Sequence, residues 1–215
     1  MLLFGNPSIE TLISILIAVG LGMTVHEFAH NYIGHLMGDP VPAREGRLTL
    51  NPLVHINWVG WLMFALIGFG ILGSAPIAAH RMRSPRWGYL AAVAAGPLAN
   101  LIVAAVFGLI FRLVVPLAVN QQIPLVVLLL LQIIIYFNVL LFVFNILPFF
   151  PLDGWHIVLA LLPPDLAYTW QRYQQYSYFA FFALILLSFV GGSLNILGIL
   201  IGQPVRAIYG ALIGF

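Results

Sequence analysis

The sequence contains no cysteine and no lysine, and it has few charged residues of either sign. Without cysteine the chain forms no disulfide and offers no thiolate, so a metal would have to be held by histidine, carboxylate or water. Charged residues make up 7% and hydrophobic residues 62% of the 215 positions, a balance that a soluble domain cannot carry. The net charge of +2 is too small to indicate nucleic acid as a partner. The composition predicts an integral membrane protein that crosses the lipid bilayer several times.

Apolar runs long enough to cross a bilayer recur along the chain. We expect spans at residues 9–37, 87–116, 123–147, 173–190 and 194–215. The run 55–79 is interrupted by Gly68, Gly70, Gly73 and Pro76, which favours a segment that enters the membrane and returns. Residues 46–50 alternate like a short strand. The expected fold is an all-α polytopic membrane protein with about five crossing helices, a re-entrant apolar segment and a short strand-like loop.

We expect residues 1–215 to form one membrane-embedded domain, with a catalytic core at about 9–162 and C-terminal helices at 173–215. The arginines predict its orientation. In the expected layout Arg112 lies on one side of the membrane, and the other seven lie on the opposite side: Arg44, Arg47, Arg81, Arg83, Arg86, Arg172 and Arg206. The positive-inside rule then predicts that the N-terminus is outside and the C-terminus in the cytosol. We expect the membrane to be a prokaryotic plasma membrane.

The first span contains the sequence His-Glu-Phe-Ala-His at 26–30. His26 and His30 lie four residues apart on one helix face, about 6 Å from each other, and could share a metal ion. Glu27 projects roughly 100° away from His26 and could act as a general base on water. Zinc sites that activate water combine imidazole ligands with such a carboxylate. The alternative is a pair of core histidines bonded to neighbouring helices. His35 lies about 180° around the helix from His26 and cannot join the same ion.

A catalytic metal needs a third protein ligand, and Asp153 is the strongest candidate among the six acidic residues. It follows a full apolar span, where Pro148 and Pro151 keep the backbone irregular and Gly154 permits a tight turn. Irregular backbone at membrane depth is tolerated where it lines a cavity. Asp153 could instead cap the short helix that follows, and His156 is a rival third ligand.

Three further polar residues in apolar surroundings are candidates for the site. Asn100 and Asn145 could form hydrogen bonds between helices, or they could bind a substrate carbonyl or an oxyanion. We expect Asn145 to act in catalysis and Asn100 to bind substrate. His55 could lie on the substrate side of the site or at the membrane interface.

Four motifs occur in an order that resembles the site-2 protease family, the intramembrane zinc metalloproteases. They are HEFAH (26–30), GRLTLNPLVHIN (46–57), AAGPLAN (94–100) and NILPFFPLDG (145–154), and the resemblance covers about residues 21–162. The segment 74–85 lacks the lysine often found there, and Asn57 stands where aspartate is frequent. These departures bear on the subfamily, and the chain resembles a minimal, core-only member.

The resemblance implies zinc held by His26, His30 and Asp153, with Glu27 as the catalytic base. It implies that Asn145 positions the substrate or the oxyanion, and that the substrate is a transmembrane helix of another protein, cut in or near the membrane. The competing class is a non-proteolytic metal-binding membrane protein, either a carrier or an inactive relative. A carrier needs ligands at several depths, whereas these candidates converge on one site. A zinc hydrolase acting on lipids or small peptides is a third option.

Overall fold

In the computed structural model most of the described part is helical and no strand occurs in it; the described residues are 8–67, 70, 73, 75–190 and 195–214. The elements in chain order are α1 (Ile9–Leu36), α2 (Val41–Arg44), α3 (Pro52–His55), α4 (Trp58–Ile67), the 3-10 turn η1 (Ala79–Arg81), α5 (Pro85–Val119), α6 (Leu125–Asn145), α7 (Asp153–Leu161), α8 (Pro164–Arg172), α9 (Gln174–Val190) and α10 (Ile196–Ile213). The spans expected from hydropathy match α1, α5, α6, α9 and α10 to within a few residues. Gly68 of the apolar run and residue 194 of the last expected span lie outside the described part.

Within the described ranges, four helices are long and apolar enough to cross a membrane: α1, α5, α6 and α10. The pair α8 and α9, bent by 54°, could form a fifth crossing. The prediction of an all-α protein with about five crossing helices is therefore confirmed, and the chain is a multi-pass membrane protein.

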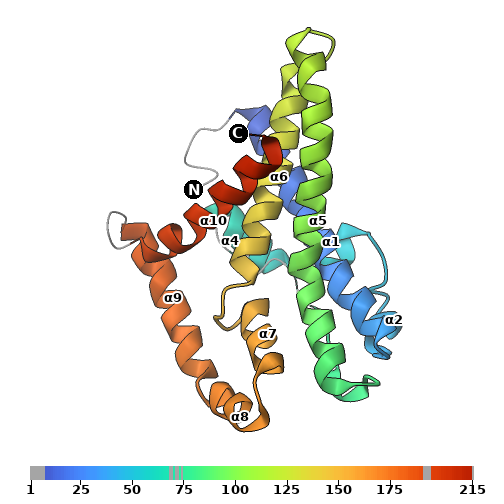
Figure 1. Ribbon diagram of the computed structural model, residues 1–215, viewed down its shortest axis with the longest axis vertical. Helices are drawn as coiled ribbons and strands as arrows, with labels where there is room; N and C mark the ends of the chain where they lie inside the picture. The colour runs from blue at the N-terminus through green and yellow to red at the C-terminus, as the bar shows by residue number, and fades with distance from the viewer. Residues whose placement is uncertain (1–7, 68–69, 71–72, 74, 191–194, 215) are drawn as a thin grey trace.

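The centre of the fold is the packing of α1 against the antiparallel hairpin of α5 and α6. With 35 residues, α5 is about 52 Å long, and its far half projects with α6 beyond the other helices (Figure 1). A buried apolar cluster joins this hairpin to the C-terminal helices, with Phe111 of α5, Ile135 and Val139 of α6, Phe181 of α9 and Ile201 of α10. The hairpin thus provides the wall against which both the N-terminal helix and the C-terminal helices pack.

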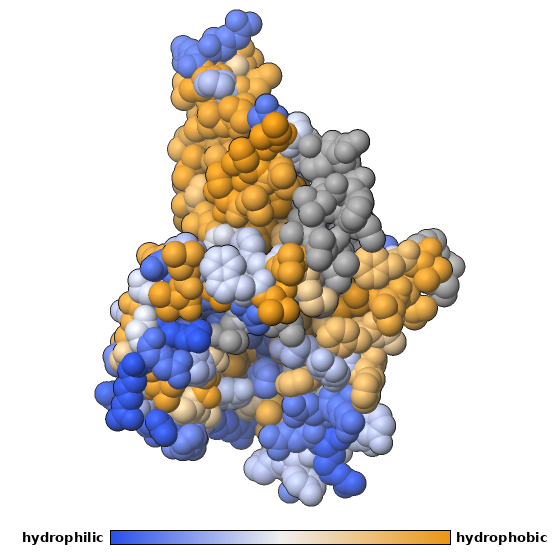
Figure 2. Space-filling view, turned by 180° about the vertical axis from the view of Figure 1, so that it is seen from behind, coloured by the Kyte–Doolittle hydropathy of each residue, from blue (hydrophilic) through white to orange (hydrophobic). Residues whose placement is uncertain are grey.

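The surface carries the hydropathy pattern of a protein embedded in lipid. Ile102, Leu109 and Leu113 on α5 are each more than 60% exposed, which is costly in water and favourable in a bilayer. Figure 2 shows hydrophobic residues over the projecting hairpin, a small polar cap at its tip, and polar residues gathered at the opposite end of the molecule.

The strand expected at 46–50 does not form, and this part of the prediction is wrong. The segment is made of turns and bends. Gly46 has φ +66°, the Arg47 N–H donates to the carbonyl oxygen of Pro42 at 2.8 Å, and the Thr49 carbonyl oxygen lies 2.8 Å from Nε2 of His55. The backbone groups are therefore used in local contacts, and the alternating sequence pattern has no partner strand to pair with.

The apolar run that follows contains no full span among its described residues. Its helix α4 has 10 residues, about 15 Å, or half the thickness of the hydrocarbon core. At the end of the run the Ala78 N–H donates to Oδ2 of Asp39 at 2.6 Å, and the Arg83 N–H donates to the Met37 carbonyl oxygen at 2.9 Å. The chain therefore returns to the end of α1 from which it left, as a re-entrant segment would.

The direction of α10 differs from the one expected. Helix α10 does not turn back toward the polar end; it runs at a large angle to α9 and packs against the hairpin of α5 and α6 (Figure 1). The Arg112 Nε donates to the Leu212 carbonyl oxygen at 2.7 Å, and its Nη2 donates to that of Ala211, so Arg112 satisfies carbonyls at the end of α10. The expected layout placed Arg112 and the C-terminus on opposite sides of the membrane, whereas this contact brings Arg112 to the end of α10. The start of α1 and the end of α10 lie in the same half of the molecule.

Candidate metal centre

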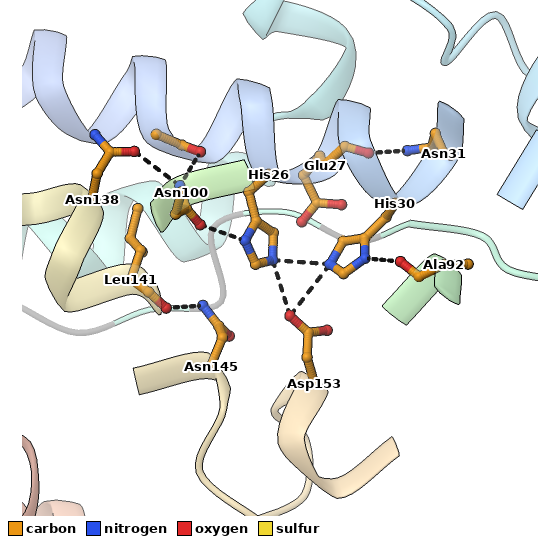
Figure 3. A network of polar contacts seen from close by, with 11 residues as sticks. His26, Glu27, His30, Asn31, Ala92, Asn100, Asn138, Leu141, Asn145 and Asp153 are labelled. Carbon is orange, nitrogen blue, oxygen red and sulfur yellow. Dashed lines mark hydrogen bonds and ion pairs between the residues drawn. The ribbon is translucent and has the colours of Figure 1, made fainter. Parts of the chain in front are cut away.

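Two histidines from α1 and one aspartate from α7 meet at a single point (Figure 3). Nε2 of His26 lies 3.1 Å and Nε2 of His30 lies 3.3 Å from Oδ2 of Asp153. The two Nε2 atoms are 3.0 Å apart, and the rings pack edge to face. The three ligand atoms predicted from the sequence are thus gathered within 4.8 Å of one another.

Hydrogen bonds behind the histidines decide which nitrogen faces this point. Nδ1 of His26 lies 2.7 Å from Oδ1 of Asn100, and Nδ1 of His30 lies 2.8 Å from the carbonyl oxygen of Ala92. Both partners are acceptors, so each Nδ1 carries the proton and each Nε2 presents a lone pair. Histidines that bind metals typically donate a hydrogen bond in this way from the ring nitrogen that does not face the metal.

Three electron-rich atoms in close contact require a cation between them. Oδ2 of Asp153 is buried, and although it lies within ion-pair distance of both imidazoles, neither contact has hydrogen-bond geometry. Two imidazole nitrogens and one carboxylate oxygen are a known ligand set of catalytic zinc, which leaves a fourth position open. The donors present therefore fit a zinc ion.

Close helix packing brings the ligands together. Gly96 of α5 lies directly against the two imidazoles, and a Cβ at this position would overlap with the ring of His30. Gly154 likewise permits the start of α7 to pack closely against the end of α6, because a Cβ there would collide with the carbonyl oxygens of Ile146 and Leu147. Asp153 itself is the first residue of α7, and its side chain does not cap the helix; the N-cap is Leu152. The capping alternative is therefore not observed.

Glu27 lies beside the two imidazoles and is 4% exposed (Figure 3). Its Oε2 is buried and has no hydrogen-bond partner among the described residues. An unpaired buried carboxylate is costly, particularly at membrane depth, and is expected where it has a task. Glu27 is thus placed to act as a base on a water molecule near the three ligands.

The metal ligands and Glu27 open onto a cavity of about 380 Å³. Its walls come from α1, α5, α6, α7 and α9, and from Gly70, Gly73, Ala75 and Ile77. Asn145 lines it, with its Nδ2 donating to the Leu141 carbonyl oxygen at 2.9 Å. Leu141, Phe144, Phe181 and Phe182 give the cavity apolar walls. The cavity therefore combines the polar groups of the site with apolar side chains.

The other predicted residues lie elsewhere. Asn100 is fully buried behind His26, where it joins α1, α5 and α6, so its position fits hydrogen bonding between helices and not contact with substrate. His55 is buried in a separate small pocket with Trp61 and Thr24. His156 lines the main cavity but is not among the converging ligands, and His35 is exposed.

Two residues at the site were not predicted from the sequence. Tyr89 of α5 lines the cavity, and Gly96 permits the contact between α1 and α5. Gly96 lies in the AAGPLAN motif, whose Gly-Pro pair inside an apolar span could have indicated close packing. Tyr89 has no such local signal, because its partners come from α7, more than 60 residues away.

Comparison with known proteins agrees with the site. The profile of Peptidase family M50 matches residues 112–188, which include Asn145 and Asp153. A protein of Bacillus subtilis (strain 168) named "Putative zinc metalloprotease YwhC" is 31% identical over 160 residues, covering 70% of this chain and 69% of that protein. No solved structure matches the chain significantly. The chain therefore belongs to Peptidase family M50, the site-2 protease family of metallopeptidases.

Proposed function

We propose that this protein is an intramembrane zinc metalloprotease that hydrolyses a peptide bond in or near the transmembrane segment of another membrane protein. One observation carries the proposal: two imidazoles, a carboxylate ligand and an unpaired glutamate converge on one cavity among apolar helices. His26, His30 and Asp153 would hold the zinc. When bound, zinc lowers the pKa of water and polarises a carbonyl group.

Glu27 carries the proton through the reaction. It takes a proton from water as the water oxygen bonds to the carbonyl carbon, and it delivers a proton to the nitrogen as the C–N bond breaks. The products are a carboxylic acid and an amine, so one water is consumed for each bond cut. The burial of Glu27, which is 4% exposed, shields its carboxylate from bulk solvent.

Asn145 supports the substrate side of the reaction. One N–H of its amide is used by the Leu141 carbonyl oxygen, which fixes the side chain at the cavity wall. The rest of the amide can bind the backbone of a substrate chain. A peptide bond within an intact helix is shielded by its own hydrogen bonds, so the bound substrate must be locally unwound. The apolar cavity wall suits the side chains of such a segment.

The proposal also places the site relative to the cytosol. Arg44, Arg81, Arg83 and Arg86 lie on or beside α2, η1 and the start of α5, at the polar end to which the metal ligands are nearer. The positive-inside rule assigns this end to the cytosol of a bacterial plasma membrane.

The test uses purified protein, a zinc assay and fluorescently labelled transmembrane peptides in detergent or liposomes. We expect about one zinc per chain and cleavage at a defined bond. Glu27→Gln should retain the zinc and lose cleavage by at least about a thousandfold, because the amide keeps the shape but accepts no proton. Bound zinc without cleavage of any peptide would favour a carrier or an inactive relative. Cleavage of lipid esters with peptides untouched would favour a lipid hydrolase, and normal turnover in Glu27→Gln would exclude its role as the base.

A further inference from the structure

We propose that His156 is a further catalytic residue, which donates a hydrogen bond from Nε2 to the carbonyl oxygen of the peptide bond being cut, and that Tyr89 holds it in the tautomer that can donate. The inference rests on the proposed proteolytic function and adds a residue to it. None of the four motifs in the sequence assigns a role to either side chain.

Tyr89 and His156 form a pair across the cavity. The Tyr89 hydroxyl lies 2.9 Å from Nδ1 of His156, and the rings are nearly perpendicular, at 86°. Tyr89 comes from the first turns of α5 and His156 from the first turn of α7. Both residues line the same cavity as the metal ligands, Glu27 and Asn145.

The contact with Tyr89 selects one form of the imidazole. A phenol O–H donates readily to an imidazole nitrogen that carries a lone pair, and a neutral histidine with Nδ1 as acceptor bears its proton on Nε2. Burial lowers the pKa of His156, which favours this neutral form. The phenyl ring of Phe150 packs against the imidazole with the ring centroids 5.9 Å apart, and so helps to hold its orientation.

The donor that results has no partner among the residues that the structure describes. Nε2 of His156 makes no hydrogen bond to any described residue. The side chain is partly buried in the cavity wall. A fixed N–H in a largely apolar cavity, close to the metal ligands in sequence and space, is suited to an acceptor brought by the substrate. The oxygen of the scissile carbonyl is the acceptor that gains negative charge when water adds to the carbon.

A role as metal ligand does not fit the same geometry. A nitrogen that carries a proton cannot bind a metal, and Nδ1 is already occupied by Tyr89. His156 is also not one of the three residues whose ligand atoms converge. A donor aimed at a developing oxyanion typically contributes a factor of about 10² to 10³ in kcat.

The experiment compares His156→Phe, His156→Gln and His156→Asn with the wild type in zinc content, kcat and KM. The amide nitrogen of glutamine reaches about as far as Nε2, whereas that of asparagine lies near the position of Nδ1. We expect all three variants to keep stoichiometric zinc, with kcat reduced about a hundredfold in the Phe and Asn variants. The kcat of the Gln variant should be at least about tenfold higher than that of the Phe and Asn variants, with KM changed little. His35→Phe, an exposed histidine on α1, is the matched control and should behave as wild type.

Tyr89→Phe tests the positioning role with a readout that a structural change alone would not move. The ¹⁵N shifts of His156, assigned by their loss in His156→Gln, should show one protonated Nε2 in the wild type and a mixture of tautomers in Tyr89→Phe. Turnover should fall about tenfold in that variant while zinc stays bound.

Three results would overturn the inference. They are equal turnover in the Gln and Asn variants, loss of zinc in step with loss of turnover, and a protonated Nδ1 in the wild type. Should His156→Phe fail to fold, the comparison of Gln with Asn still decides. If the wild type cleaves no peptide at all, the proposed function fails; if it cleaves and His156→Phe is unimpaired, only this inference fails.

Discussion

Oδ1 of Asn100 accepts a hydrogen bond from Nδ1 of His26 at 2.7 Å, and this contact turns the other nitrogen of His26 toward Asp153. The amide of Asn100 is held in this orientation by its own donors, which reach the Gly22 carbonyl oxygen at 2.9 Å and Oδ1 of Asn138 at 3.0 Å. One fully buried side chain thus joins α1, α5 and α6 and sets the tautomer of a predicted ligand.

Replacing Asn100 should therefore weaken the metal site before it affects anything else. We expect Asn100→Leu to lower zinc affinity about 10- to 100-fold, because His26 loses the acceptor that fixes its ring. Competition with a chromophoric chelator measures the affinity directly. Asn145→Ala is the matched control, since it removes an amide at the cavity wall and should reduce turnover with zinc affinity unchanged. Unaltered affinity in Asn100→Leu would contradict the role given to the contact.

The metal ligands can be separated from the nearby histidines by single substitutions. His26→Ala, His30→Ala and Asp153→Ala should each reduce bound zinc sharply, because each removes one of the three ligands that converge among the described residues. His35→Ala and His156→Ala should retain it. A chelator should abolish cleavage by the wild type, and added zinc should restore it. If Asp153→Ala kept its full zinc content and His156→Ala lost it, the third ligand would be His156 and not Asp153.

Much of this arrangement could be predicted from the sequence because its parts are local. The spacing of His26 and His30 follows from one turn of helix, and the apolar runs gave the spanning helices to within a few residues. The proline-rich approach to Asp153 indicated an irregular backbone, as observed between α6 and α7. These signals all lie within segments of about 30 residues or fewer.

The parts that sequence reasoning missed depend on contacts between distant segments. Asn100 could be recognised as a buried amide, but its partner His26 lies 74 residues away. Nothing near Tyr89 indicates its contact with His156. The course of α10 was not foreseen because the count of arginines assumed that each helix reverses the last, whereas α10 runs at a large angle to α9 and ends beside Arg112. The strand expected at 46–50 had the alternation of a strand but no edge to pair with.

Arg86 is expected to support the metal site from the far end of α7. Its Nε donates to the Ala160 carbonyl oxygen at 2.8 Å, and its Nη2 donates to those of Leu161 and Leu162 at 2.9 and 3.1 Å. These are carbonyls at the C-terminal end of the helix that begins with Asp153. Arg86→Ala should free this end of α7 and lower zinc affinity about tenfold, with Arg86→Lys intermediate because lysine cannot reproduce the planar set of donors.

The same chelator competition measures this effect. Arg81→Ala is its control, since Arg81 is exposed in the neighbouring turn η1 and its Nε donates to His80, the adjacent residue. Equal affinities in the wild type, Arg86→Ala and Arg81→Ala would show that α7 is held in place without Arg86.

The course of the chain through the membrane can be tested by cysteine labelling, because the sequence has no native cysteine. Thr49→Cys and Ser84→Cys should both react with a membrane-impermeant reagent from the cytosolic face only. The segment between them returns to the end of α1, where Ala78 is bonded to Asp39, and the arginine-rich end faces the cytosol. Gln122→Cys, in the exposed turn between α5 and α6, should react from the other face.

A cysteine added after Phe215 tests the direction of α10. It should be labelled from the same face as Gln122→Cys and not from the face that labels Ser84→Cys, because Arg112 binds the end of α10 partway toward that turn. Labelling of Ser84→Cys from outside would mean that the apolar run crosses the membrane. Labelling of the added cysteine from the cytosol would mean that α10 turns back, against the contact between Arg112 and Leu212.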